Sequence, residues 1–172
     1  DAMRAEGVAA LDWLEGFVAA EGIDCGFRRA GRFLGAHTPA EYRALAALAQ
    51  RLRAEEGRDE RAVPPDEQRG EIGTDLYHGG LLHPSYGALH PARYHRGLLD
   101  RALSARAAVV AHCPARAIRP SGRGFEIDTA RGTLAARDVV VATNGYTAGL
   151  VPWLARRVVP IGSYVIATEP LP

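Results

Sequence analysis

The residues best suited to touch a ligand follow an apolar segment in the last third of the chain. Residues 138–142 read Asp-Val-Val-Val-Ala, and Thr143, Asn144 and Gly145 come directly after them. Gly145 has no Cβ and lets the backbone approach a ligand, while the Thr143 hydroxyl and the Asn144 amide can hydrogen-bond phosphate or ribose oxygens. In a doubly wound sheet, such a position at the carboxyl end of a strand faces the ligand. An ordinary turn explains the same residue types equally well, because Gly and Asn are common in turns.

Four histidines within a short stretch raise the question of a metal site: His78, His83, His90 and His95. Two of them precede proline, and none forms the helical i, i+4 pair with an intervening acid that zinc enzymes use. No nearby cysteine or carboxylate cluster completes a ligand shell. We therefore expect no metal in this segment.

A charged run carries four carboxylates that could in principle act as acid and base: Glu55, Glu56, Asp59 and Glu60. Arginines are interspersed among them, so a solvated helix end explains them better than a catalytic pair. Because residues 55–68 also contain Pro64-Pro65, we expect a solvated linker there with little core of its own. The sequence has no Gly-x-Ser-x-Gly elbow, so an acyl-transfer nucleophile is not indicated.

Composition excludes several classes of function. The 172 residues carry 21 basic and 20 acidic side chains, and this net charge of +1 offers no field for holding a nucleic acid. All basic residues are arginine, which excludes lysine-based chemistry. No apolar run approaches the ~20 residues of a membrane span. Cys25 and Cys113 are isolated, so neither a disulfide framework nor a zinc module is indicated, and we expect a reducing, cytoplasmic setting.

Helical periodicity dominates the first two thirds of the chain. Apolar residues at helical spacing predict a helix that stops near Gly22. Residues 25–35 are aromatic and interrupted by glycine, which favours a bent pair of strands or a hairpin. Thr38 can cap a helix with proline at its first position and glutamate at its third, and Gly57 ends that helix. The pair at residues 90–91, His-Pro, opens another helix.

The period changes to two in the last third of the chain, which predicts strands. We expect short strands at residues 108–112 and 125–129, a turn at 130–132, a buried strand at 138–142 and a last strand at 158–168. The pair Gly122 and Gly124 suits a hairpin turn between strands.

Several segments, in chain order, resemble the FAD-dependent amine and amino-acid oxidases of the D-amino acid oxidase superfamily, in particular glycine oxidase-like and gamma-glutamylputrescine oxidase-like members. They are residues 23–25 with 27–29 and Gly31, YHGG at 77–80, LHPARY at 89–94 with 97–98, VVATNGYT at 140–147, and residues 152–154, 159–164 and 167–170. Each segment is weakly diagnostic, whereas the ordered set is specific.

The resemblance implies a mixed α/β fold, with part of a doubly wound FAD-binding domain and part of a substrate domain built on an antiparallel sheet. It places residues 1–20 at the boundary of the two domains, 21–85 in the substrate domain, 86–150 in the FAD-binding domain, and 151–172 on a strand returning to the substrate domain. The family's Gly-x-Gly-x-x-Gly turn, which holds the FAD pyrophosphate at a helix start, does not occur here. The chain therefore looks like the middle of an oxidase.

The resemblance also implies which residues lie near the FAD cofactor: Ala115, Ala142, Thr143, Asn144 and Gly145. Tyr164 lies on a segment that resembles the strand passing the flavin into the substrate domain, so it could face a small amine or amino-acid substrate. No catalytic residue is assigned, because the cofactor takes the hydride and the protein mainly supplies orientation and electrostatics. Two alternatives remain open: a non-catalytic nucleotide-binding or interaction module, and a dehydrogenase or hydroxy-acid oxidase on the same scaffold.

Overall fold

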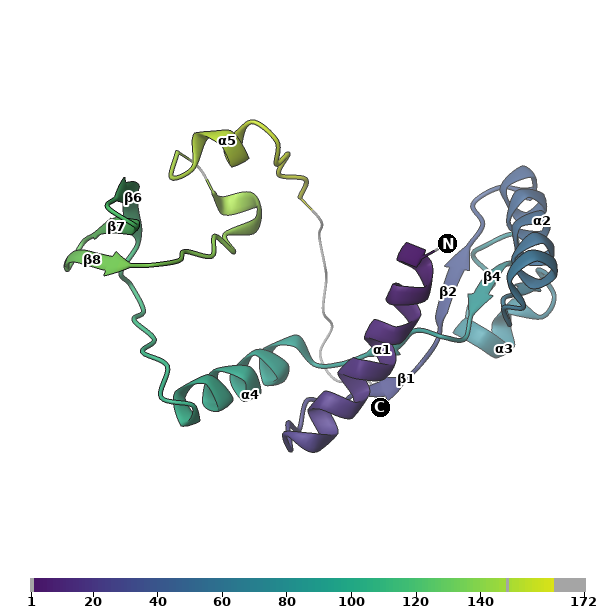
Figure 1. Cartoon of the computed structure of the whole chain (residues 1–172). Coiled ribbons are helices and arrows are strands. Elements are labelled where there is room, and N and C mark those ends of the chain that lie inside the picture. Colours follow the sequence, from purple (N-terminus) through teal and green to yellow (C-terminus); the bar gives the residue numbers. More distant parts are fainter. Residues whose placement is uncertain (1, 148, 163–172) are drawn as a thin grey trace. The chain divides into compact units, whose positions relative to one another are not determined.

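The computed structural model describes residues 2–147 and 149–162. The chain divides into two compact units, Asp1–Ala108 and Val109–Pro172, which are described separately here (Figure 1). The mixed α/β composition predicted from the sequence is confirmed. The boundaries proposed for the FAD-binding and substrate domains stay a prediction, since compact units alone do not assign a segment to either domain.

The first unit contains four helices and five strands among its described residues. In chain order these are α1 (Ala2–Ala20), β1 (Arg28–Arg29), β2 (Arg32–Gly35), α2 (Pro39–Glu56), β3 (Arg61–Val63), α3 (Gln68–Ile72), β4 (Gly80–His83), β5 (Gly87–Ala88) and α4 (Pro91–Ser104). Strands β2, β4 and β3 form an antiparallel sheet in that order, and β1 pairs with β5. Figure 1 shows α2 and α3 beside the strands β2 and β4.

The helix boundaries follow the capping signals in the sequence. The Thr38 hydroxyl accepts a hydrogen bond from Glu41 N, and Gly57 ends α2 in the left-handed region at φ 62°. The Glu41 carboxylate accepts from His37 N, one residue before the cap. His90 caps α4, with Pro91 at its first position. The predictions of helices beginning after Thr38 and at the His-Pro pair are therefore confirmed.

Of the two forms predicted for residues 25–35, the structure has the bent pair of strands and not the hairpin. Strands form in the segment, but β1 pairs with β5 and β2 pairs with β4. Gly31 turns the chain between them at φ 68°. The aromatic residues indicate strands, whereas the pairing partners lie 45 to 60 positions further along the chain, where local sequence does not reveal them.

The main core of the first unit lies between α2 and the three-stranded sheet. Its buried members are Ala36, Leu45, Ala49 and Leu81. Within the sheet, Gly80 lets β4 lie close to β2, because a Cβ there would lie 2.5 Å from the Leu34 carbonyl oxygen and from the Phe33 ring. A second cluster joins α1 to the loop before β1 and consists of Val18, Ile23 and Cys25.

The predicted linker at residues 55–68 is wrong, since it contributes both a strand and buried groups. Val63 on β3 is fully buried, and Glu60 and Gln68 are each 2% exposed. The Glu60 carboxylate pairs with Arg58 and lies 3.4 Å from His83 Nδ1 on β4. The Gln68 side chain donates to the main-chain oxygens of Pro65 and Tyr77. The polar composition hides this buried segment, because Glu60 and Gln68 are polar residues that usually lie in solvent.

The Glu60 carboxyl is held ionised by its surroundings. Burial by itself raises its pKa, but hydrogen bonds from its own backbone N–H, from Arg58 and from His83 outweigh that effect. The net pKa lies below the ordinary value of 4.5. Sequence reasoning placed Glu60 in solvent, so this buried ion pair is a correction.

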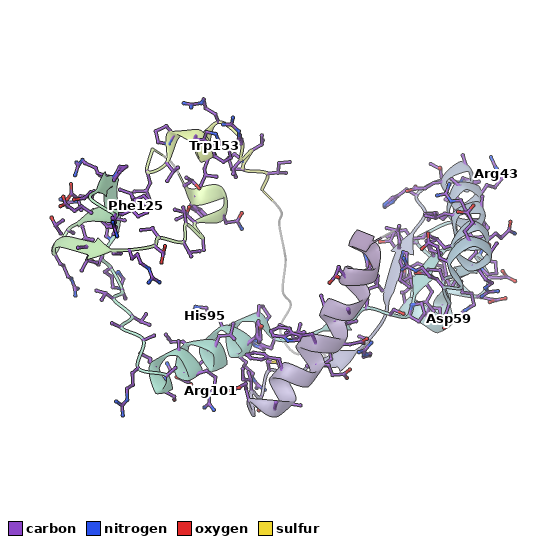
Figure 2. The ribbon with its side chains drawn as sticks, in the orientation of Figure 1. Arg43, Asp59, His95, Arg101, Phe125 and Trp153 are labelled. Carbon is purple, nitrogen blue, oxygen red and sulfur yellow. The ribbon has the colours of Figure 1, made fainter. Side chains whose placement is uncertain are left out.

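The second unit begins with an antiparallel meander. Its strands are β6 (Ala115–Ser121), β7 (Gly124–Thr129) and β8 (Gly132–Ala136), followed by the one-turn helix η1 (Asn144–Tyr146) and the short helix α5 (Pro152–Ala155). The hairpin turn at Gly122 and the turn at residues 130–132 are confirmed. Figure 2 shows the Phe125 side chain on β7 and the Trp153 side chain on α5.

Two strands predicted for this unit are absent from the part of the chain that the structure describes. Residues 108–110 and 138–142 form no strand, residues 111–112 form a turn with His112 at φ 54°, and Val140 is 89% exposed. Residues 158–162 likewise form no strand, and the rest of the predicted segment 158–168 lies outside the described residues. An apolar strand of a doubly wound sheet needs neighbours on its edges and cover on both faces, and the described residues supply neither.

We expect Gly80→Ala to destabilise the first unit by about 1–3 kcal/mol, because its methyl group must displace the Leu34 carbonyl or the Phe33 ring. The matched control is Gly70→Ala on α3, where a Cβ meets nothing within 4 Å and helix propensity improves. Denaturant unfolding of both variants checks this. Equal stabilities of the two variants would contradict the close approach.

We expect Glu60→Gln to lower the free energy of unfolding at neutral pH by about 1–3 kcal/mol, because Arg58 loses its charged partner. A carboxyl whose folded pKa is depressed stabilises the fold above its unfolded pKa. That contribution is lost as pH falls through the lower, folded value. The gap between wild type and variant should therefore narrow below about pH 4.5. A gap that is constant with pH would show that Glu60 is not held ionised.

Candidate functional site

The segment after residue 142 folds into a tight turn. Asn144 adopts the left-handed region at φ 50°, which asparagine tolerates better than most residues. The N–H of Tyr146 donates to the Thr143 carbonyl at 2.9 Å. The N–H of Gly145 donates to Oδ1 of Asn144 at 2.8 Å. The turn predicted by the residue types Thr-Asn-Gly is therefore present.

Two hydroxyl groups hold the turn from within. Thr147 is 4% exposed, and its hydroxyl donates to the Asn144 carbonyl at 2.9 Å. The Thr143 and Thr147 hydroxyl oxygens are 2.8 Å apart. Because a hydroxyl has one proton to donate, Thr143 must be the donor in this second bond. Thr143 then has only acceptor capacity left for a ligand.

This hydrogen bonding corrects part of the expectation for the site. With its proton bonded to Thr147, the Thr143 hydroxyl cannot donate to a phosphate oxygen, although it can accept from a ribose hydroxyl. Asn144 uses Oδ1 for Gly145, and among the described residues no partner takes the two N–H groups of its Nδ2, which can donate to a ligand. The turn therefore suits sugar hydroxyls at Thr143 and oxygen acceptors at Asn144.

The turn forms one wall of a cavity of about 470 Å³. Asn144, Gly145 and Tyr146 line one side, and residues 159–162 line the other. A Cβ on Gly145 would lie 3.4 Å from Cβ of Pro160, which is ordinary contact. Tyr146 and Ile161 are strongly exposed, at 91% and 86%. Residues 159–162 were predicted as part of a strand and of a family-like segment, but their place opposite the turn depends on the fold of the whole unit.

The remaining predicted residues lie elsewhere. Ala142 is exposed and directly precedes the turn. Ala115 starts β6 and pairs with Thr129, so it belongs to the meander and not to the cavity lining. A strand begins at Ala115, whereas the strand predicted just before it, at residues 108–112, is not formed. Tyr164 lies outside the described residues.

Other clusters of ionisable groups have structural roles. His83 contacts Glu60, and His90 caps α4. Within the described residues, no group of three or more potential metal ligands is present. None of the described helices combines the length and apolar character needed to span a bilayer. His95 and Arg101, labelled in Figure 2, lie on α4.

Comparison with known proteins identifies the family. The family of FAD dependent oxidoreductases known as DAO matches residues 2–172, and the chain belongs to it. The family resemblance seen in the ordered sequence segments is therefore confirmed, as is FAD as the cofactor of the family. The chain is a mixed α/β member whose described part shows antiparallel sheets.

The chain is similar to three curated proteins. It is 32% identical over 104 residues to the probable oxidoreductase OrdL of Haemophilus influenzae, covering 58% of this chain and 24% of that protein. It is 33% identical over 106 residues to the probable oxidoreductase OrdL of Rhizobium meliloti, covering 62% of this chain and 25% of that protein. It is 31% identical over 153 residues to gamma-glutamylputrescine oxidoreductase of Escherichia coli, covering 87% of this chain and 35% of that protein. The chain thus spans about a quarter to a third of these relatives' lengths.

Solved structures share the fold. Glycine oxidase from Geobacillus kaustophilus superposes with a TM-score of 0.75 at 24% identity, covering 87% of this chain and 41% of that one. L-proline dehydrogenase from P. horikoshii superposes with a TM-score of 0.67 at 13% identity, covering 83% and 38%.

The residues at the turn fit contact with the dinucleotide part of FAD. Gly145 leaves room at the cavity wall, Asn144 has two free donors and Thr143 has a free acceptor. The donor set lacks a cation for the pyrophosphate among the cavity-lining residues. These residues therefore suit the sugar and neutral polar groups of the cofactor better than its phosphates.

We expect Thr147→Val to loosen the turn, because valine keeps the shape but removes the hydroxyl that bonds Thr143 and Asn144. Loss of these bonds should cost about 1–2 kcal/mol locally. Hydrogen exchange at the Tyr146 amide measures it, with Thr147→Ser as the control that keeps the hydroxyl. If the Tyr146 amide exchanges equally fast in Thr147→Val and in wild type, the Thr147 hydroxyl bonds do not stabilise the turn.

Proposed function

We propose that this chain is the central part of an enzyme that oxidises the C–N bond of a small amine or amino acid to an imine. The observation that carries the proposal is the family match over residues 2–172. Its finer content is supported by the names of similar proteins, which refer to gamma-glutamylputrescine, glycine and L-proline. When bound, FAD supplies the chemistry by accepting the hydride equivalent from the substrate. The protein's part is to bind and orient.

The turn after residue 142 is proposed to hold the sugar side of the cofactor. Gly145 admits the ligand next to the backbone, Asn144 donates through Nδ2, and the Thr143 hydroxyl accepts from a ribose hydroxyl. Ala142 and Ala115 are proposed to contribute main-chain surface near the cofactor. Tyr164 is proposed to face the substrate. The prediction of a cytoplasmic location also remains a proposal, supported by two cysteines that are free in the structure.

A dehydrogenase is the second candidate, favoured by the likeness of the fold to L-proline dehydrogenase. The two candidates share the oxidation of substrate and differ in what reoxidises the flavin. A polypeptide that includes the sequence flanking residues 1–172 should be assayed for peroxide release and for reduction of an artificial electron acceptor. Peroxide with an amine or amino acid supports the oxidase, and acceptor reduction without peroxide supports the dehydrogenase. Neither activity with any such substrate would refute the proposal.

We expect residues 1–172 alone to bind FAD weakly or not at all, because the sequence lacks the glycine-rich turn and helix start that offset the pyrophosphate charge. The longer polypeptide should purify yellow. Flavin absorbance and fluorescence titration measure both. Stoichiometric flavin bound to residues 1–172 would show that FAD binding does not need the glycine-rich turn and helix start.

In the longer polypeptide, Gly145→Leu should weaken FAD binding by about tenfold, because a branched side chain fills the cavity wall. Gly145→Ala is the matched control, since its Cβ meets Pro160 only at ordinary contact distance. Equal affinities of wild type and Gly145→Leu would place the cofactor away from this turn.

A further inference from the structure

The proposed ligand turn contains a dipeptide with its own chemistry. Asn144 is the only asparagine among the 172 residues, and glycine follows it. A glycine after asparagine leaves the main-chain nitrogen unhindered, since no Cβ shields it. Asn144 is exposed, so water and hydroxide reach its amide.

The geometry of the turn brings the reacting groups together. The Gly145 nitrogen lies 2.8 Å from Oδ1 of Asn144, so the side chain already folds back onto the following amide. Among the described residues, the partner of this N–H is the Asn144 side chain and not a main-chain carbonyl. The Gly145 N–H therefore takes no part in the hydrogen bonds to the main-chain carbonyls of the turn. Those carbonyls accept from the Tyr146 N–H and from the Thr147 hydroxyl.

From these contacts we propose that Asn144–Gly145 is a site of spontaneous deamidation and isoaspartate formation. Hydroxide removes the proton of the Gly145 nitrogen, which then bonds to Cγ of Asn144. The Cγ–Nδ2 bond breaks, the side-chain nitrogen leaves as ammonia, and a cyclic succinimide results. Water opens the ring at either carbonyl, giving aspartate or isoaspartate. Nothing is oxidised or reduced, and the solvent supplies both water and hydroxide.

The product changes the turn in two ways. A carboxylate replaces a neutral amide at the cavity wall, which removes the two Nδ2 donors and adds a negative charge. An isoaspartyl link also adds a main-chain methylene group where Tyr146 N–H bonds the Thr143 carbonyl. The modified turn therefore no longer offers the donor set described above. This consequence for the cofactor rests on the proposed function, whereas the modification itself does not.

The sequence makes the test specific. No Asp-Gly dipeptide is present and Asn144 is the sole asparagine, so isoaspartate in this chain reports on one position. Purified residues 1–172 are incubated folded at mildly acidic and mildly alkaline pH. Isoaspartate is then measured by enzymatic methylation and by mass analysis of the tryptic peptide 138–156. Both measurements detect isoaspartate without flavin, so a negative result would count against the deamidation and not against the proposed function.

The expected result is isoaspartate at position 144 in the folded wild-type chain, formed faster at alkaline pH because the nitrogen must lose its proton. Gly145→Ala should slow it by about tenfold, the factor given by about 1.4 kcal/mol of activation free energy. Asn144→Gln should remove it, because the longer side chain must close a larger ring. The chain unfolded in urea is the reference. If the unfolded chain forms isoaspartate and the folded chain does not, the proposal is overturned. An unchanged rate of isoaspartate formation in Gly145→Ala would also overturn it.

Discussion

Close approach of backbone at residues without a Cβ is the constraint on which the first unit depends. Strand β4 can lie against β2 because Gly80 has no Cβ, and a methyl group there would stand 2.5 Å from the Leu34 carbonyl oxygen. Leu81, the next residue on β4, is fully buried in the core cluster that includes Leu45 and Ala49 of α2. Further along β4, His83 lies 3.4 Å from the buried Glu60 carboxylate, which also pairs with Arg58.

The second unit depends on hydrogen bonds within the turn rather than on a missing Cβ. A Cβ on Gly145 would meet Pro160 only at ordinary contact distance, whereas the hydroxyls of Thr143 and Thr147 hold the turn from inside. The apolar residues around it are exposed: Val140, Tyr146, Val159 and Ile161. The chain spans about two fifths of the similar solved structures. The described residues of this unit show the turn at residues 143–147 and no strand across residues 138–142.

Local signals in the sequence were sufficient where the structure is local. Thr38, Gly57 and the His-Pro pair marked helix ends correctly, and Thr-Asn-Gly marked a turn, because caps and turns are set by residues a few positions apart. The pairing of strands that are far apart in the sequence could not be predicted, and β1 and β2 both pair with such strands. The polar composition of residues 55–68 also concealed the partly buried strand β3. The Val run at residues 138–142 forms no strand among the described residues. Within the site, the residue types at 143–145 were predicted, while the brace by Thr147 and the wall at 159–162 depend on tertiary structure.

We propose that the turn at residues 143–145 contacts the sugar side of FAD. A crystal structure of the longer polypeptide with FAD bound tests this contact directly. We expect ribose hydroxyls within hydrogen-bond distance of the Thr143 hydroxyl oxygen, Asn144 Nδ2 donating to the cofactor, and Val140 covered by neighbouring strands. Cofactor density bound elsewhere, with the turn still facing solvent, would contradict it.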